Sequence, residues 1–236
     1  QHQLADPRYQ GLRYTQDFND LACDAPHGLE PATLDGKVAV FYADGNGFGK
    51  IGRGCMSPAA LREWDSYLKL QRKALLSGLV ERAMREPRWQ RSDGTLRFET
   101  LLWGGDELRF VVPAWCALEL ADLFFELTRD MQYLEPPPCQ APPPDPADRV
   151  TNRLTHACGL VMCHRQAPIS SITRLSQALA EEGKRGQPGT NSLNWTVLES
   201  FDHAGDDLAG FLHRRFPKAQ PALGWADLAL GAEAVA

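Results

Sequence analysis

Two short segments of this chain, at 38–52 and 101–112, most restrict the folds that it can adopt. Each contains an apolar run of the kind that forms buried β-strands, together with glycines and a carboxylate that are typical of tight turns. Asp44 follows the first run, and Asp106 and Glu107 lie within the second segment. Neighbouring strands would bring these three carboxylates to one edge of a sheet. Because clustered acidic groups repel one another, a site that keeps them ionised normally binds divalent cations.

The pattern along the chain predicts the order β-α-β-β-α-β, a ferredoxin-like unit of the α+β class. In this unit the first and third strands are central neighbours, so the turn after the first strand lies beside the hairpin that begins the third. That hairpin has glycine turn chemistry at Gly104 and Gly105. We expect strands at 37–43, 97–103, 107–112 and 154–164, helices at 58–85, 115–134 and 169–184, and then a strand at 193–201 and a short helix at 204–215.

The sequence divides into three regions. Residues 1–36 are a polar, turn-rich lead-in, residues 37–201 form the main domain, and residues 202–236 are an Ala/Leu-rich helical tail. The proline-rich stretch at 135–148 cannot form regular structure, because proline lacks the N–H that helices and sheets use. We interpret it as a stiff surface loop or a domain-swapped arm.

Composition excludes several classes of protein. The 236 residues, 43% of them hydrophobic, suit one large domain or a compact domain with appendages. No apolar run is long enough to span a bilayer and no secretory segment is evident, so we expect a cytoplasmic protein with reduced cysteines. The formal charge of −5 argues against an extended nucleic-acid-binding surface but allows a pocket for one nucleotide.

The turn after the first strand has the composition of a phosphate-binding turn. Glycines allow backbone N–H groups to approach a phosphate closely, and lysine and arginine add positive charge. Lys184 and Arg185, at the end of the 169–184 helix, could reach a triphosphate from across the sheet edge. The candidate nucleotide-binding residues are Gly45, Asn46, Gly47, Phe48, Gly49, Lys50, Gly104, Gly105, Lys184 and Arg185.

Asp44, Asp106 and Glu107 are the candidate catalytic and metal-binding residues. Two Mg²⁺ (or Mn²⁺) ions bound there could acidify an attacking ribose hydroxyl and neutralise the leaving pyrophosphate. Mg²⁺ keeps several of its waters, so two or three carboxylates are enough to hold it.

Simpler interpretations exist for each motif. An aspartate beside glycines is often only a turn residue, and Lys184 and Arg185 are typical cations of a helix C-terminus. Residues 47–52 match the G-x-G-x-x-G pattern, but Asp44 lies where a pyrophosphate would arrive, which argues against a dinucleotide-binding fold. A zinc site on the 154–164 strand is disfavoured, because alternation places Cys163 on the face opposite to His156, Cys158 and His164.

Three motifs together resemble the nucleotide-cyclase palm superfamily: Y-A-D-G-N-G-F-G-K, then G-G-D-E-L, then A-C-G-L-V-M-C-H-R-Q-A-P-I followed by L-S-Q-A-L-A-E-E-G-K-R. The likeness is greatest to the catalytic palm of the CRISPR polymerase, the large subunit of type III CRISPR effector complexes. It covers roughly residues 37–201. Two departures are Glu107, where that palm has a second aspartate, and Gly183, where it has alanine before the lysine.

The resemblance implies a palm that condenses nucleoside triphosphates, with ATP favoured, into cyclic di- or oligonucleotides in antiphage signalling. G-G-D-E also resembles the motif of diguanylate cyclases, so synthesis from GTP is an alternative. A further alternative is a nucleotide-binding palm that acts as a sensor or subunit without catalysis. A single palm usually supplies half of a two-nucleotide site, and we therefore expect a homodimer.

Overall fold

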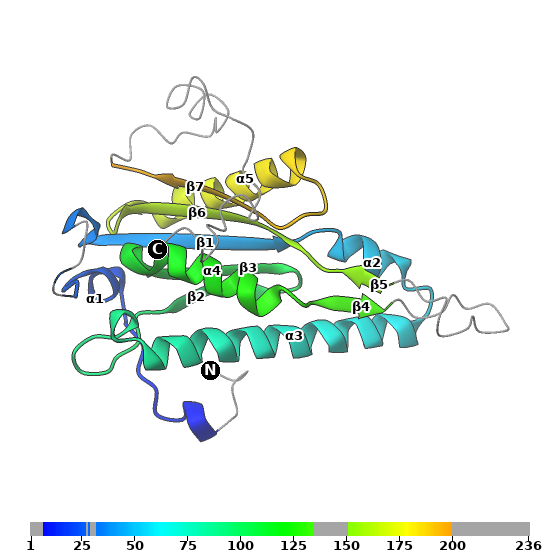
Figure 1. The fold of residues 1–236 in the computed structure, drawn as a ribbon, viewed down its shortest axis with the longest axis horizontal. Helices are drawn as coiled ribbons and strands as arrows, with labels where there is room; N and C mark the ends of the chain where they lie inside the picture. Colours follow the sequence, from blue (N-terminus) through cyan, green and yellow to red (C-terminus); the bar gives the residue numbers. More distant parts are fainter. Residues whose placement is uncertain (1–6, 27, 29–31, 135–150, 200–236) are drawn as a thin grey trace, which may run out of the picture.

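The computed structural model describes residues 7–26, 28, 32–134 and 151–199, and it contains a five-stranded sheet (Figure 1). The order of the strands is β2-β3-β1-β6-β7. Strand β1 pairs antiparallel with β3 and with β6, and β6 pairs parallel with β7. The first four strands of the predicted unit thus have the ferredoxin-like arrangement, with the first and third strands adjacent. The sheet strands are β1 (Lys37–Gly45), β2 (Glu99–Gly104), β3 (Glu107–Pro113), β6 (His156–His164) and β7 (Ser192–Val197).

Helices cover both faces of the sheet (Figure 1). Phe41 and the other alternate residues of β1 pack on the face covered by α3 and α4, whereas Val38 and Val40 pack on the face covered by α5. This alternation is why β1 is buried on both sides and reads as a continuous apolar run. The helices are α1 (Phe18–Ala22), α2 (Phe48–Gly54), α3 (Pro58–Arg85), α4 (Ala117–Thr128) and α5 (Ile169–Gly186).

Helix α3 has the predicted bounds, and its start shows why. The Ser57 hydroxyl accepts a hydrogen bond of 3.1 Å from the backbone N–H of Ala60, and Pro58 occupies the first turn. Both residues are strong helix-start signals because they satisfy or remove N–H groups that have no partner in the first turn.

Other boundaries correct the sequence prediction. The helix expected at 115–134 ends at Thr128, because the chain turns into a short strand, β4 (Gln132–Leu134), which pairs with β5 (Thr151–Arg153). Helix α2 was not predicted, because its G-x-G-rich start reads as a loop. Strand β7 ends at Val197 rather than at 201. The proline-rich segment at 135–148 and the helix expected at 204–215 lie outside the described residues.

The lead-in contacts the domain through a buried arginine. Arg97, only 2% exposed, donates hydrogen bonds to the backbone carbonyls of Asp20, Leu21, Cys23 and Asp24, and its guanidinium stacks on Trp115. These bonds fix the end of α1 against the sheet. The part of the lead-in that the structure describes is therefore an integral part of the fold.

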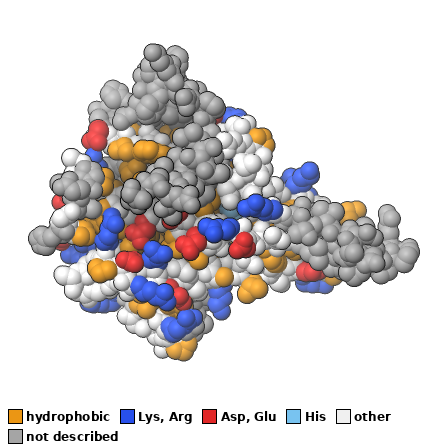
Figure 2. Space-filling model, viewed as in Figure 1, with side chains coloured by type: hydrophobic (Ala, Val, Ile, Leu, Met, Phe, Trp, Pro, Cys, Tyr) orange, Lys and Arg blue, Asp and Glu red, His pale blue; other side chains and the backbone are white. Residues whose placement is uncertain are grey.

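The surface and the cysteines have the following features. On the face shown in Figure 2, basic side chains alternate with acidic ones rather than forming a single basic region. None of the helices in the described part of the chain combines the length and apolarity needed to cross a bilayer. The described cysteines are free thiols.

A very close contact between the sheet and a helix lies at Gly159 of β6, under α5. A Cβ atom at this position would lie 1.8 Å from the backbone oxygen of Ser176, which is far inside contact distance. The neighbour is helix backbone and cannot rotate away. Glycine is therefore required here for α5 to approach the sheet.

We predict that Gly159→Ala destabilises the protein by about 3 kcal/mol, the upper part of the usual range for overpacking. Urea denaturation would measure this. Gly54→Ala is the matched control, because a Cβ at Gly54 would meet nothing within 4 Å. Equal stability of the two variants would contradict the proposed close contact.

Candidate functional site

The end of β1 and the tip of the β2–β3 hairpin lie side by side. Asp44 is directly opposite Glu107 in the β1–β3 register, and the N–H of Gly45 donates a 3.0 Å hydrogen bond to the carbonyl of Asp106. Gly105, with φ of 54°, occupies the first position of the two-residue turn, where glycine is favoured. The predicted meeting of the three acidic residues at one sheet edge is thus present in the backbone geometry.

Lys184 reaches this edge from the last turn of α5. Its Nζ lies 2.5 Å from Oδ2 of Asp44, and both side chains are partly buried. The preceding residue, Gly183, lies so close to β7 that a Cβ there would be 2.6 Å from Oγ of Ser192. This explains why glycine replaces the alanine expected from the resemblance.

The environment of Asp44 opposes its ionisation. Burial raises the pKa of this carboxyl, Lys184 lowers it through the hydrogen bond and its charge, and the charges of Asp106 and Glu107 raise it further; the net shift is upward. The carboxylates therefore interact electrostatically, and the site favours added positive charge.

Glu107 has a partner that the sequence analysis missed. The phenol of Tyr42 donates a 3.0 Å hydrogen bond to Oε1 of Glu107, and the guanidinium of Arg109 lies over the Tyr42 ring at 5.0 Å. Tyr42 precedes Asp44 by two residues, so the period of a strand places both on the α5 face. That spacing was the available signal, but within the apolar run Tyr42 looked like a core residue.

Asn46 joins three segments at the edge of the site. Its side-chain amide donates to Oγ1 of Thr155 at 3.0 Å and to the carbonyl of Thr190 at 2.7 Å, and its backbone N–H donates to the carbonyl of Thr155. Asn46 thus fixes the turn after β1 against the start of β6 and the loop after α5.

The other candidate nucleotide-binding residues lie around the carboxylates, some close to them and some facing solvent. The N–H groups of Gly47, Phe48 and Gly49 have no hydrogen-bond partner among the described residues, which is the usual state of a helix start. Lys50 is exposed. Arg185 is 69% exposed and pairs with Glu182 at 2.6 Å, so this conformation directs it away from Asp44. Gly104 is the last residue of β2, opposite Glu107.

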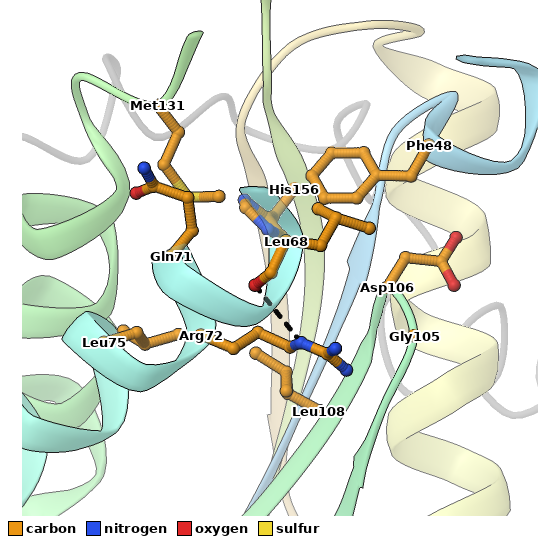
Figure 3. A pocket seen from close by; sticks show the side chains of 10 residues that line it. All are labelled: Phe48, Leu68, Gln71, Arg72, Leu75, Gly105, Asp106, Leu108, Met131 and His156. Carbon is orange, nitrogen blue, oxygen red and sulfur yellow. Dashed lines mark hydrogen bonds between the residues drawn. The ribbon is translucent and has the colours of Figure 1, made fainter. Parts of the chain in front are cut away.

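A small pocket opens beside the hairpin on the α3 side of the sheet (Figure 3). Its interior has a volume of about 20 Å³, room for roughly one water molecule. Arg72 extends across it from α3, held by one hydrogen bond from Nε to the carbonyl of Leu68. The lining residues are Phe48, Leu68, Gln71, Arg72, Leu75, Gly105, Asp106, Leu108, Met131 and His156.

His156 is the buried polar group of this pocket. Its ring packs edge-on against Phe48 and Phe124, and Nδ1 has no hydrogen-bond partner in the described structure. Burial, with a smaller contribution from the charge of Lys184, lowers its pKa to about 4. The imidazole is therefore neutral at pH 7 and can donate one hydrogen bond and accept another.

The residues at the sheet edge supply the type of ligand atom that a Mg²⁺ ion prefers. Carboxylate oxygens are its preferred ligands, and the end of β1 with Asp44 lies beside the hairpin that carries Asp106 and Glu107. Across the described ranges, no three His, Cys, Asp or Glu side chains are arranged to surround one metal ion. Asp44, Asp106 and Glu107 are the residues that would hold the cation, and the ammonium of Lys184 supplies positive charge at Asp44.

Comparison with known proteins finds similar folds among solved structures. No family model matches the sequence, and no curated protein matches it either. Among solved structures, the chain is similar to the apo Csm1–Csm4 cassette, with a TM-score of 0.52 and 16% identity over 89% of this chain and 25% of that one.

Two further similar structures are cyclases. One is the diguanylate cyclase SiaD from Pseudomonas aeruginosa in complex with its activator SiaC, with a TM-score of 0.45, 12% identity, and coverage of 68% of this chain and 50% of that one. The other is the GGDEF domain of DgcB from Caulobacter crescentus in complex with c-di-GMP, with a TM-score of 0.42, 14% identity, and coverage of 70% and 79%. The chain thus spans half or less of the Csm1–Csm4 and SiaD chains. The likeness to the Csm1–Csm4 cassette is one of fold.

We predict that Asp44→Asn stabilises the ligand-free protein at pH 7 by on the order of 1 kcal/mol. A carboxyl whose pKa is raised in the folded state contributes stability that is fully present below its ordinary pKa of 3.8 and is lost as the pH rises through the folded value. The gain from the substitution should therefore be largest near neutral pH.

Urea denaturation at pH 7 and at pH 4 would measure this difference, with the gain shrinking at the lower pH. A variant that is less stable than the wild type at pH 7, or equally stabilised at both pH values, would contradict the assigned environment of Asp44.

Proposed function

We propose that this protein is a metal-dependent nucleotidyltransferase that condenses nucleoside triphosphates into cyclic di- or oligonucleotides and releases pyrophosphate. The observation that carries the proposal is the pairing of Asp44 with Lys184 next to Asp106, at the meeting point of two strand ends. A cation-binding carboxylate pair beside a phosphate-binding cation is what phosphoryl transfer requires.

In the reaction, a ribose hydroxyl oxygen of one nucleotide forms a bond to the α-phosphorus of another, the bond to pyrophosphate breaks, and the hydroxyl proton passes to solvent. A divalent cation, when bound, lowers the pKa of the hydroxyl and neutralises charge on the phosphates. Asp44, Asp106 and Glu107 would hold that cation. Lys184 is then free to leave Asp44 and bind the triphosphate as a point charge.

Two neighbouring features suit the rest of the nucleotide. The N–H groups of Gly47, Phe48 and Gly49, which have no partner among the described residues, are donors for phosphate oxygens. The pocket beside Asp106 offers apolar walls for a base, with donors on Arg72 and a neutral imidazole on His156. Its small interior means that Arg72 or Met131, both unbranched and flexible, must move for a base to enter.

The partner and role inferred from the resemblance also belong to the proposal. A homodimer would let the strand tips of two copies face each other and complete a two-nucleotide site. Antiphage signalling is the context that the CRISPR polymerase resemblance supports, with ATP as the favoured substrate.

We predict that incubation with the four nucleoside triphosphates and Mg²⁺ or Mn²⁺ yields a cyclic nucleotide that mass spectrometry detects. Cyclic adenylates would identify a CRISPR-polymerase-like activity, and cyclic diguanylate would identify the cyclase alternative. Asp106→Asn should abolish product while the fold is retained, because its side chain makes no hydrogen bond within the described structure and only its backbone carbonyl is used.

Asp122→Asn, a change of an exposed aspartate on α4, is the matched control and should retain full activity. Absence of product under both metals together with tight nucleotide binding would favour the non-catalytic sensor. Turnover by Asp106→Asn would refute the mechanism.

We predict that Lys184→Met weakens binding of a triphosphate by about 10- to 100-fold, the value of one charge-assisted hydrogen bond, and leaves binding of the corresponding nucleoside unchanged. Isothermal titration with the non-hydrolysable triphosphate and the nucleoside separates the two. Lys69→Met is the control, since Lys69 makes only an exposed pair with Asp65. An equal loss for both ligands would assign Lys184 a purely structural role.

A further inference from the structure

The ion pair between Lys184 and Asp44 joins two groups that the proposed reaction uses for different ligands. Nζ of Lys184 lies 2.5 Å from Oδ2 of Asp44, so the last turn of α5 is in contact with the end of β1. In the proposed reaction, Asp44 is one of the carboxylates for the cation, and Lys184 is the point charge for the triphosphate. In the ligand-free protein each of the two groups is instead occupied by the other.

Burial makes this ion pair stronger than a pair at the open surface. The side chain of Asp44 is 18% exposed and that of Lys184 is 31% exposed. The negative charges of Asp106 and Glu107 act on Asp44 as well and increase its need for a cation. Charges that are partly shielded from water interact more strongly than charges in solvent. A ligand that needs either Lys184 or Asp44 therefore has to overcome a substantial attraction.

The lysine side chain is the part of this pair that can move. Asp44 lies in β1, which is paired with β3 on one side and with β6 on the other. The backbone of α5 is packed against the sheet at Gly159, where a Cβ atom would lie 1.8 Å from a helix carbonyl oxygen. Lys184 has a flexible, unbranched stem of four carbons. Rotation of this stem opens the pair without any movement of the helix or the strand.

Each ligand on its own meets a cost at this pair. For a divalent cation to bind at Asp44, Lys184 has to leave, and its ammonium then loses its hydrogen-bond acceptor. A triphosphate that draws Lys184 away leaves Asp44 unpaired and brings further negative charge toward Asp106 and Glu107. When both ligands are present, the carboxylate receives the cation and the ammonium receives the triphosphate, so neither group is left unpaired.

We propose that the ion pair between Lys184 and Asp44 is an autoinhibitory contact, which disfavours binding of the cation alone or of the triphosphate alone and couples the binding of the two. This inference rests on the proposed metal-dependent function and concerns the regulation of the same site. Because the coupling between two ligands is reciprocal, the contact must weaken the binding of each ligand alone. Removing either member of the pair should therefore strengthen the binding of the ligand that needs the other member.

Titration of the metal alone tests the contact from the side of Asp44. Isothermal titration with Mn²⁺, without nucleotide, would compare the wild type with Lys184→Met. We expect Lys184→Met to bind Mn²⁺ about 10- to 100-fold more tightly, because no charge-assisted hydrogen bond has to be broken first. Arg185→Met is the matched control, since it removes the same charge one residue away, from a side chain that is 69% exposed and paired with Glu182. Its affinity for Mn²⁺ should stay within about 2-fold of the wild-type value.

Titration of the triphosphate alone tests the contact from the side of Lys184. With a non-hydrolysable triphosphate and excess EDTA, Asp44→Asn should bind about 10-fold more tightly than the wild type, because an amide holds Lys184 less strongly than a carboxylate does. Asp106→Asn is the matched control, because it removes a neighbouring negative charge while the ammonium of Lys184 keeps its contact with Asp44. Its gain should be clearly smaller. Melting temperatures without ligands would show that each variant is folded.

Two results would overturn this inference alone. One is Mn²⁺ binding by Lys184→Met that is no tighter than that by the wild type or by Arg185→Met, which would leave Lys184 as a phosphate ligand only. The other is an equal gain in triphosphate binding for Asp44→Asn and Asp106→Asn, which would mean that the charge of the carboxylates, and not the ion pair, weakens this binding. A wild type that binds neither ligand even when both are supplied together would instead overturn the proposed metal-dependent function, and this inference with it.

Discussion

The position of α5 against the sheet is the constraint on which the site depends. At Gly159 the helix backbone lies where a side chain would otherwise be, and at Gly183 a Cβ atom would lie 2.6 Å from Oγ of Ser192. These are contacts with backbone and with a short side chain, so they define the height and register of the helix more sharply than flexible side chains would. Lys184 follows directly, and its distance to Asp44 is a consequence of that packing. The packing of α5 therefore places the ammonium of Lys184 beside the partly buried carboxylate of Asp44.

The two carboxylates that face α5 therefore have hydrogen-bond donors before any ligand binds. Each carboxylate that faces α5 has a donor of its own, an ammonium for Asp44 and a phenol for Glu107. Burying unpaired carboxylates would cost considerable free energy, and these two donors offset that cost. The partly exposed lysine and the buried tyrosine do so in different ways, since only the lysine can be displaced by a ligand at little structural cost.

Much of this arrangement could be predicted from sequence, and the reasons for success and failure are physical. Strand β1 and helix α3 have strong signals, a continuous apolar run in one case and a serine cap followed by proline in the other, and both were located closely. The hairpin at Gly105 was predicted because glycine turn chemistry is local. Helix α2 was not predicted because the glycines at its start and middle are typical of a loop. In the structure, Phe48 packs into a buried apolar cluster and stabilises this helix.

Partners that are distant in sequence were harder to predict. The hydrogen bond from Tyr42 to Glu107 joins residues whose proximity depends on strand register. Because its neighbours in sequence are apolar, Tyr42 was interpreted as a core residue. Asn46 was read as a phosphate-turn residue, but its amide also joins the turn to Thr155 and Thr190, which only the assembled fold brings together. Helix α4 ends at Thr128, before the expected position 134, because β4 pairs with β5. No local sequence pattern predicts this pairing.

That two-stranded ladder has a consequence for how the protein could vary. Gln132 pairs with Arg153 and Leu134 pairs with Thr151. The end of β4 and the start of β5 therefore lie together, beside the aromatic cluster of Trp64, Tyr67 and Tyr133. Closing a longer loop over such a base costs little additional entropy, since the cost grows only with the logarithm of loop length. The pairing of β4 with β5 therefore makes the geometry of the five-stranded sheet independent of the number of residues between these two strands. It marks the place where evolution, or an engineer, could insert a domain with little disturbance of the sheet.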